Sequence, residues 1–231
     1  MIYFLISFFL FTISIPSSLA ETILLYEIFY GPIKLGESKI ILSPKELQAY
    51  AYTTGTGNVL YPFQAKWQTS IDSLGYPKKS IIYSKDRFKE REKSVIFYPS
   101  KKQVQLKQVL PSPKEKIYEL SFPLHDELSA FVASWYLNYE ENLTFQLPIF
   151  VKGEKYFANL KLKKIVPCNF KETTSSCYEI ETLLPEASEL LKRSKEITIL
   201  LHREEKIPVE IKGALPIFGS LTAKLKSYVK H

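Results

Sequence analysis

Apolar and polar residues alternate along much of this chain, and the alternation predicts β-strands. Successive side chains of a strand point to opposite faces of a sheet, so a period of two marks one buried face and one solvated face. Strands of this kind are typical of antiparallel sheets. The pattern is clear in five segments: Gln64–Ile71, Lys155–Lys163, Glu196–His202, Lys206–Lys212 and Leu221–Lys226.

Short turn-forming sequences separate the strand-like segments at hairpin spacing. They are Gly31-Pro32, Gly75-Tyr76-Pro77, Lys152-Gly153 and Arg203-Glu204-Glu205. Glycine and proline favour tight turns, and consecutive hairpins build a large curved sheet or an open barrel. The stretch Pro111–Lys116 is rich in proline and lysine and is predicted to be a loop.

One segment, Leu124–Tyr139, departs from the period of two and predicts an amphipathic helix. Asp126 is a suitable N-cap for it. A shorter second helix is predicted at Pro185–Arg193, where proline occupies the first turn. The longer helix must bury its apolar stripe, and the concave side of the curved sheet is the expected place. The stripe has helical spacing and consists of Leu128, Phe131, Val132, Trp135, Tyr136 and Tyr139.

These elements predict a mainly β fold, in which a curved antiparallel sheet or open β-barrel wraps around one amphipathic helix, with a short second helix. Removing the first 20 of the 231 residues leaves 211, which is enough for one sizeable core. Residues 21–231 are therefore predicted to form a single open-barrel domain.

The first twenty residues have the features of a secretory signal peptide. They contain no Asp, Glu, Lys or Arg, and Ile2–Ile15 is almost entirely apolar. Small residues at Ser18 and Ala20 suit signal peptidase, which predicts cleavage after Ala20 and a periplasmic location. No Lys or Arg precedes the apolar core. The alternative is an uncleaved N-terminus that anchors the protein in the inner membrane.

The formal net charge of +7 bears on which kinds of molecule the protein could bind. Lysines and arginines are interspersed with acids, as on an ordinary solvated surface. The excess positive charge also suits weak attraction to an anionic membrane face or an acidic glycan. Nucleic acid is a poor partner for an exported protein that has no recognition motif. After cleavage we expect peripheral membrane contact or none.

Two cysteines, Cys168 and Cys177, lie nine positions apart. Outside the cytoplasm such a pair most simply forms a disulfide that closes a short loop. Metal binding is the alternative, although two thiols without neighbouring His or Asp ligands make an incomplete site.

Residues that could support catalysis or bind a metal do not form a recognisable set. His125 lies beside Asp126 and Glu127 and could act as a base, but such a trio is more often a helix-capping segment. His202 and His231 have no paired ligands nearby in the sequence. No phosphate-binding glycine loop, metal-spaced cluster or nucleophile elbow is present. We therefore predict no catalytic residue, metal or cofactor.

The aromatic residues have two interpretations. They concentrate on strands and a helix that are expected to face each other, which favours an ordinary aromatic core. They could also line a cleft that admits an acyl chain when the helix moves, because an open barrel of this size can hold one small ligand. The candidate lining residues are Tyr50, Tyr52, Phe63, Trp67, Leu128, Phe131, Val132, Trp135 and Tyr136.

Six short segments occur in a distinctive order along the chain: Tyr26–Gly31, Leu35–Glu37, Ser70–Pro77, Asp126–Phe131, Ile207–Ile211 and Phe218–Leu225. Their order resembles the bacterial "domain of unknown function 3108" family of exported proteins. The resemblance implies a curved antiparallel sheet around a helix, similar to the open barrel of LolA- and LolB-type lipoprotein carriers and receptors. It implies no established activity and no catalytic residue, and the cysteine pair is not part of the family pattern.

The preferred functional hypothesis is a non-catalytic periplasmic binding protein that holds a lipid, a lipoprotein acyl chain or another apolar envelope molecule in its concave sheet. Hydrophobic burial would supply the affinity. A second hypothesis is an envelope assembly or scaffold protein that acts through contact with other envelope proteins. A remote third is a hydrolase of envelope polymers, for which His125 is the best candidate base.

Overall fold

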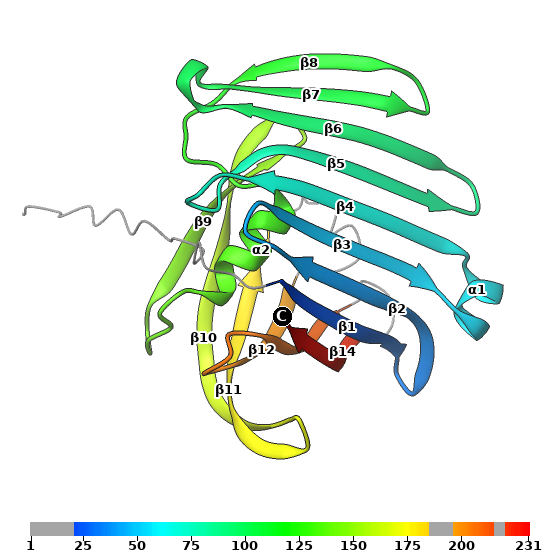
Figure 1. The fold of residues 1–231 in the computed structure, drawn as a ribbon, viewed down its shortest axis with the longest axis vertical. Helices are drawn as coiled ribbons and strands as arrows, with labels where there is room; N and C mark the ends of the chain where they lie inside the picture. Colours follow the sequence, from blue (N-terminus) through cyan, green and yellow to red (C-terminus); the bar gives the residue numbers. More distant parts are fainter. Residues whose placement is uncertain (1–20, 185–195, 215–219) are drawn as a thin grey trace, which may run out of the picture.

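Fourteen strands form one antiparallel sheet that curves around a helix (Figure 1). This computed structural model describes residues 21–184, 196–214 and 220–231. The helices of this part are α1 (Gly55–Leu60) and α2 (Glu127–Trp135), with a 3-10 turn at Pro99–Lys101. The strands are β1 (Thr22–Tyr30), β2 (Ile33–Leu42), β3 (Glu46–Thr53), β4 (Phe63–Ile71), β5 (Pro77–Asp86), β6 (Glu90–Tyr98), β7 (Gln103–Leu110), β8 (Lys114–Glu119), β9 (Thr144–Val151), β10 (Glu154–Phe170), β11 (Thr173–Leu183), β12 (Glu196–His202), β13 (Pro208–Ala214) and β14 (Ser220–Lys230).

The strand order follows the chain in two runs. Strands β1 to β8 lie side by side in sequence order, and so do β9 to β14. Pairing of β1 with β14 joins the two runs in the interior of the sheet and leaves β8 and β9 at its edges. The predicted fold class, a mainly β protein with a curved antiparallel sheet wrapped around an amphipathic helix, is confirmed.

The two edge strands, β8 and β9, share no backbone pairing among the described residues. Their contact is made by side chains. The rings of Tyr118 on β8 and Phe150 on β9 lie 5.9 Å apart, centroid to centroid. A side chain at Gly153 would overlap the Tyr118 ring. The segment before α2 covers the free edge of β9: His125 N–H donates to the Pro148 carbonyl and His125 O accepts from Phe150 N–H, both at 2.8 Å. The fold is therefore an open barrel whose gap is packed.

Helix α2 fills the concave side of the sheet. Its residues Leu128, Val132 and Trp135 are at most 5% exposed. A nine-residue helix is marginal in water by itself. Burial of each such apolar side chain contributes about 1.5–3 kcal/mol, so packing stabilises the helix. The inward-facing residues of the same core include Leu24, Leu47, Ile71, Leu160, Ile180 and Leu201, which come from both runs of strands.

Asp126 connects the beginning of α2 to the sheet. Its Oδ1 accepts a hydrogen bond from Ser129 N–H at 2.8 Å, so the predicted N-cap is confirmed. Its Oδ2 accepts three more, from Trp67 Nε1 at 2.9 Å, Thr69 Oγ1 at 2.6 Å and Ser80 Oγ at 2.7 Å. Asp126 is only 3% exposed, and these four donors replace the water that its carboxylate loses on burial.

Most strand and turn predictions are confirmed. Each of the five alternating segments contains a strand, namely β4, β10, β12, β13 or β14, and each predicted turn joins consecutive strands. The disulfide between Cys168 of β10 and Cys177 of β11 is also confirmed. Both thiols are used in this bond, which removes the metal-binding alternative. The predicted signal peptide, 1–20, and the second helix, 185–193, lie outside the described residues.

The structure corrects two predicted boundaries. Helix α2 is shorter than the predicted segment Leu124–Tyr139 because the residues around His125 pair with β9 before the helix begins. The loop predicted at Pro111–Lys116 ends at Pro113, and Lys114 already pairs with β7 as the first residue of β8. Lysine-rich sequence is compatible with an edge strand, since lysines there oppose pairing with other chains.

Helix α1 was not predicted, because its sequence contains two glycines, which are poor helix formers. Gly57 is required by packing: a Cβ at this position would overlap the Leu35 carbonyl oxygen of β2. Leu35 O also accepts a hydrogen bond from Thr54 N–H at 2.9 Å, just before α1. The close approach to β2 therefore fixes this short helix at one end of the sheet.

We predict that Asp126→Ala lowers the free energy of unfolding by about 3 kcal/mol or more, because the helix loses its cap while two buried donors, Thr69 and Ser80, and the half-buried Trp67 lose their acceptor. Asp126→Asn keeps an acceptor oxygen and should lose less. Urea denaturation followed by circular dichroism measures both values. The control is Asp72→Ala, in a turn where Oδ1 accepts from two backbone N–H groups; it should lose about 1 kcal/mol. Equal losses for Asp72→Ala and Asp126→Ala would contradict the anchoring role.

Candidate functional site

A groove of about 600 Å³ lies on the outer face of β1–β5, the face turned away from α2. Ligand pockets typically measure about 300–1,000 Å³, so the groove is large enough for a small molecule. Its lining comprises Leu25, Tyr26, Glu37, Ser38, Lys39, Ile41, Tyr50, Ala51, Tyr52, Gln64, Ala65, Lys66, Tyr83 and Lys226.

Strand register places lysines and tyrosines alternately across the floor of this groove. Lys39 of β2 pairs with Tyr50 of β3, Tyr50 with Lys66 of β4, and Lys66 with Tyr83 of β5. Leu25 of β1 continues the row beside Lys39. Side chains directly opposite on neighbouring strands share a face and have Cβ atoms about 4.5–5.5 Å apart. We call Leu25, Lys39, Tyr50, Lys66 and Tyr83 the cross-strand row.

Two lysines of the row are available to an anionic group. Within the described residues, neither Lys39 nor Lys66 pairs with a carboxylate. The Lys66 Nζ lies 5.6 Å from the centroid of the Tyr50 ring, so the ammonium group and the aromatic face already contact each other. The row therefore combines positive charge with apolar ring surface.

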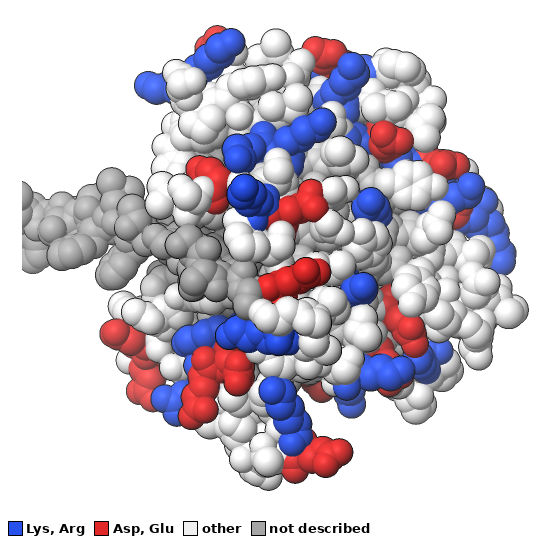
Figure 2. All heavy atoms as spheres, viewed as in Figure 1, with Lys and Arg blue, Asp and Glu red and all other residues white. Residues whose placement is uncertain are grey.

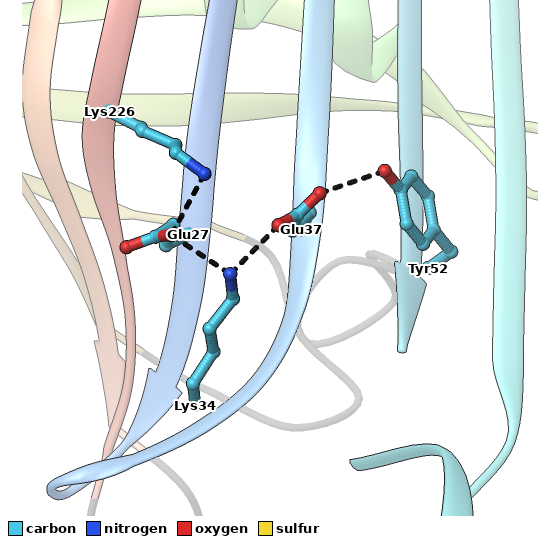
Figure 3. Close-up of polar contacts among 5 residues, drawn as sticks. All are labelled: Glu27, Lys34, Glu37, Tyr52 and Lys226. Carbon is cyan, nitrogen blue, oxygen red and sulfur yellow. Dashed lines mark hydrogen bonds and ion pairs between the residues drawn. The ribbon is translucent and has the colours of Figure 1, made fainter. Parts of the chain in front are cut away.

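A charge-balanced network lies at one end of the groove (Figure 3). Lys34 Nζ contacts Glu27 Oε1 at 2.9 Å and Glu37 Oε1 at 2.8 Å. Lys226 Nζ lies 3.2 Å from Glu27 Oε1, and Tyr52 OH donates to Glu37 Oε2 at 3.0 Å. The hydrogen bonds from Lys34 hold the pKa values of both glutamates below their usual range, while Glu37 raises the pKa of Tyr52. The charged groups of this network pair with one another, whereas Lys39 and Lys66 have no carboxylate partner among the described residues.

The candidate lining residues predicted from the sequence do not lie in one cleft: some lie on the outer face of the sheet, some on its inner face and the rest on α2. Tyr50 and Tyr52 lie in the outer groove, and Tyr52 points into the network of Figure 3. Trp67 lies on the inner face, where its indole bonds Asp126, and Phe63 has the same strand phase. The other five belong to α2 or its C-cap: Leu128, Val132 and Trp135 are buried, whereas Phe131 and Tyr136 are half-buried.

Three functional candidates were missed in the sequence: Lys39, Lys66 and Tyr83. Lys66 occupies a polar position of an alternating strand, where lysine usually signals only solvent exposure. Their common feature is the strand register, which a single strand's pattern does not contain.

The hollow on the inner face is smaller, about 180 Å³. It lies between β4–β7, the beginning of α2 and β9, and its wall includes Trp67, Asp126, Phe150 and Lys93. Its volume is below the range of about 300–1,000 Å³ that is typical of ligand pockets. The same side of the sheet carries α2, whose apolar side chains pack in the core.

His125, the candidate base, is surrounded by protein. It is 3% exposed, its Nδ1 lies 3.2 Å from Ser129 Oγ, and Ser129 is fully buried. The Tyr76 ring lies 4.9 Å from the imidazole, centroid to centroid. Burial lowers the pKa of His125 to about 4, although Asp126 and Asp72 oppose this shift. Its burial and these contacts give His125 a structural role in the fold.

The second histidine, His202, is also buried and lies near the disulfide. His202 pairs with Cys177 across β11 and β12, and its Nε2 lies 2.7 Å from Ser175 Oγ. Across residues 21–184, 196–214 and 220–231 there is no cluster of three or more His, Cys, Asp or Glu side chains suited to a metal ion. Among the same residues, neither helix is long and apolar enough to cross a bilayer.

We predict that protein stability falls between pH 7 and pH 5 partly through His125. Its pKa is depressed in the folded protein, from 6.5 to about 4. The unfolded chain therefore binds a proton in this window that the folded protein does not, and stability decreases as the pH falls. The contribution is about 2 kcal/mol. Urea unfolding across this pH range should give a flatter profile for His125→Gln, while His231→Gln, at the exposed terminus, keeps the wild-type slope. An unchanged slope in His125→Gln would contradict the assignment.

Comparison with solved structures finds one with a similar fold and a second with a weaker similarity. A β-barrel-like protein of the domain of unknown function DUF1849 from Brucella abortus has a TM-score of 0.62 at 11% identity, covering 92% of this chain and 98% of that chain. A DUF1089 family protein from Pseudomonas aeruginosa gives a TM-score of 0.41 at 9% identity, covering 83% of this chain and 94% of that chain. At these identities the similarity concerns the fold alone, and the fold argument rests on the first structure.

Sequence comparison identifies the family. None of the curated proteins that were compared matches the chain. The sequence model described as "Protein of unknown function (DUF3108)" matches residues 25–226, which span every described strand in whole or in part. The resemblance predicted from the sequence is therefore confirmed, while the further likeness to LolA- and LolB-type carriers stays a prediction. The chain belongs to the DUF3108 family of proteins of unknown function.

Proposed function

We propose that this protein is a non-catalytic binding protein of the bacterial cell envelope that holds an anionic amphipathic ligand in the outer groove. The observation that carries the proposal is the cross-strand row, in which two lysines without carboxylate partners among the described residues alternate with tyrosines. A ligand with one anionic group and an apolar chain matches both parts of this surface. The features of residues 1–20 favour an envelope location.

The volumes of the two hollows support a ligand site on the outer face of the sheet. The concave side is occupied by α2, and the inner hollow of about 180 Å³ is less than a third of the outer volume of about 600 Å³. A ligand can enter the outer groove without displacing buried side chains. Binding there requires no movement of α2.

The expected affinity is modest because the groove is open to solvent. Each exposed charge contact contributes about 0.2–1 kcal/mol, and each aromatic contact about 0.5–1.5 kcal/mol. Two lysines and two tyrosines therefore support a dissociation constant of about 0.2–100 mM for a short single-chain ligand. Longer apolar chains should bind more tightly, since each buried CH₂ adds about 0.8 kcal/mol.

We predict that the double variant Lys39→Gln/Lys66→Gln binds octyl phosphate about 2- to 30-fold more weakly than the wild type, because two charge contacts are lost. Binding of octyl glucoside, which has the same chain and no charge, should change less than twofold. Isothermal titration calorimetry below the micelle concentration of each probe measures both affinities on the exported protein.

The matched control removes two charges elsewhere. Lys79 on β5 and Lys107 on β7 are exposed and lie outside the groove lining. Lys79→Gln/Lys107→Gln should therefore bind octyl phosphate like the wild type. If both double variants lose affinity equally, net charge and not the groove attracts the ligand. If an acidic oligosaccharide binds the same lysines at least tenfold more tightly than octyl phosphate, the ligand is a glycan and the amphiphile proposal is wrong.

A further inference from the structure

Exposed apolar side chains gather at one end of the sheet, where α1 and the β5–β6 turn lie. Val59 is 77% exposed, Leu60 is 61% exposed and Phe88 is 76% exposed. In Figure 1, α1 and the turn after β5 both project from the same end of the sheet. Arg87 Nη2 links the two connections by donating to the Val59 carbonyl at 3.3 Å. We call Val59, Leu60 and Phe88 the apolar tip.

The backbone that carries the apolar tip is fixed by specific contacts. Oδ1 of Asp86 accepts hydrogen bonds from the N–H groups of Phe88 and Lys89, both at 2.8 Å. The bond from Phe88 is the main cause that lowers the pKa of Asp86. On the other side, Gly57 packs against the Leu35 carbonyl and holds α1 on β2. The turn chemistry therefore fixes the backbone from which the exposed Phe88 side chain projects.

Basic residues surround the apolar tip. Residues 85–91 read Lys-Asp-Arg-Phe-Lys-Glu-Arg, four cations against two acids. Both acids pair with cations of the same segment: Glu90 contacts Lys85 at 3.2 Å, and Asp86 contacts Arg91 at 3.7 Å. Arg87 and Lys89, which flank Phe88 directly, have no carboxylate partner in the described part of the chain. Figure 2 shows a largely uncharged surface at the position of α1, with Lys and Arg atoms beside it.

We propose that the apolar tip docks on an anionic phospholipid bilayer. Val59, Leu60 and Phe88 would enter the boundary between headgroups and acyl chains, while Arg87 and Lys89 contact lipid phosphates. An exposed apolar patch rimmed by polar residues is typical of an interaction site. Apolar burial combined with attraction to anionic lipids is the physical basis of peripheral membrane binding. This inference is independent of the ligand in the groove.

The docked orientation would bring the groove close to the lipid. Tyr52, which lines the groove, is the second-last residue of β3, and α1 begins at Gly55. The network of Lys34, Glu37 and Tyr52 therefore lies at the same end of the sheet as the apolar tip. A ligand that leaves the bilayer at this point could enter the groove directly.

The test is co-sedimentation of the exported protein with vesicles of phosphatidylcholine, or of phosphatidylcholine with 30% phosphatidylglycerol. The wild type should partition at least tenfold more strongly to the anionic vesicles. Val59→Ser/Leu60→Ser/Phe88→Ser should lose at least tenfold in this partitioning. Arg87→Gln/Lys89→Gln should lose about tenfold or more and bind both vesicle types similarly, since each basic residue near an anionic surface contributes about 1 kcal/mol.

The matched control is Leu74→Ser/Ile117→Ser, which removes apolar residues that are 48% and 61% exposed at other places. It should bind like the wild type. Mass spectrometry establishes the N-terminus of every sample, because residues 1–20 are apolar enough to bind lipid themselves. Comparison is made only between variants with the same N-terminus.

Insertion depth gives a second readout. The tryptophan fluorescence of the Phe88→Trp variant, after subtraction of the wild-type spectrum, should shift to the blue when anionic vesicles are added. The proposal is overturned if the wild type does not bind anionic vesicles, or if the triple-serine variant binds as well as the wild type. It is also overturned if sedimentation shows self-association that the triple variant abolishes without any vesicle binding, because the tip would then contact a second copy of the chain.

Discussion

The carboxylate of Asp126 is the contact on which the arrangement of this protein depends. A short helix inside a curved sheet has few ways to fix its position, because apolar packing alone has no direction. Asp126 supplies the direction: one oxygen caps α2, and the other receives three donors from β4 and β5. A buried carboxylate is tolerated only when its hydrogen bonds are complete. The helix is thereby held against the strands that form part of the groove floor on their opposite face.

This anchoring separates the two faces of the sheet by role. The inner face is filled by α2 and by side chains from both runs of strands, and the gap between β8 and β9 is packed by Tyr118 and Phe150. The outer face carries the cross-strand row and the groove. In our proposal the ligand binds the outside of a rigid sheet, and the apolar tip at the end of the same strands brings that surface to the membrane. Neither step requires the barrel to open.

The sequence pattern predicted the strands and the helix cap, which depend on residues close together in the chain. It did not reveal the contacts that depend on how the strands are paired. Alternation identified β4, β10, β12, β13 and β14, and Asp126 was identifiable as an N-cap from its neighbours alone. Its bonds to Trp67, Thr69 and Ser80 join positions more than forty residues apart, so no local pattern contains them. Tyr50 and Trp67 were expected in one cleft, but the strand phase places them on opposite faces. Helix α1 was missed because the close approach of Gly57 to Leu35 outweighs a poor helix propensity.

The central claim is that the ligand occupies the outer groove and leaves the interior closed. Methyl-resolved NMR of the protein with a spin-labelled octyl phosphate tests it most directly, because paramagnetic relaxation depends steeply on distance. Leu25 and Ile41 have their methyl groups in the groove lining, whereas those of Val95 and Val151 line the inner hollow. We predict that the probe relaxes the signals of Leu25 and Ile41 and spares those of Val95 and Val151. Selective relaxation of Val95 and Val151 would place the ligand inside the sheet and contradict the account.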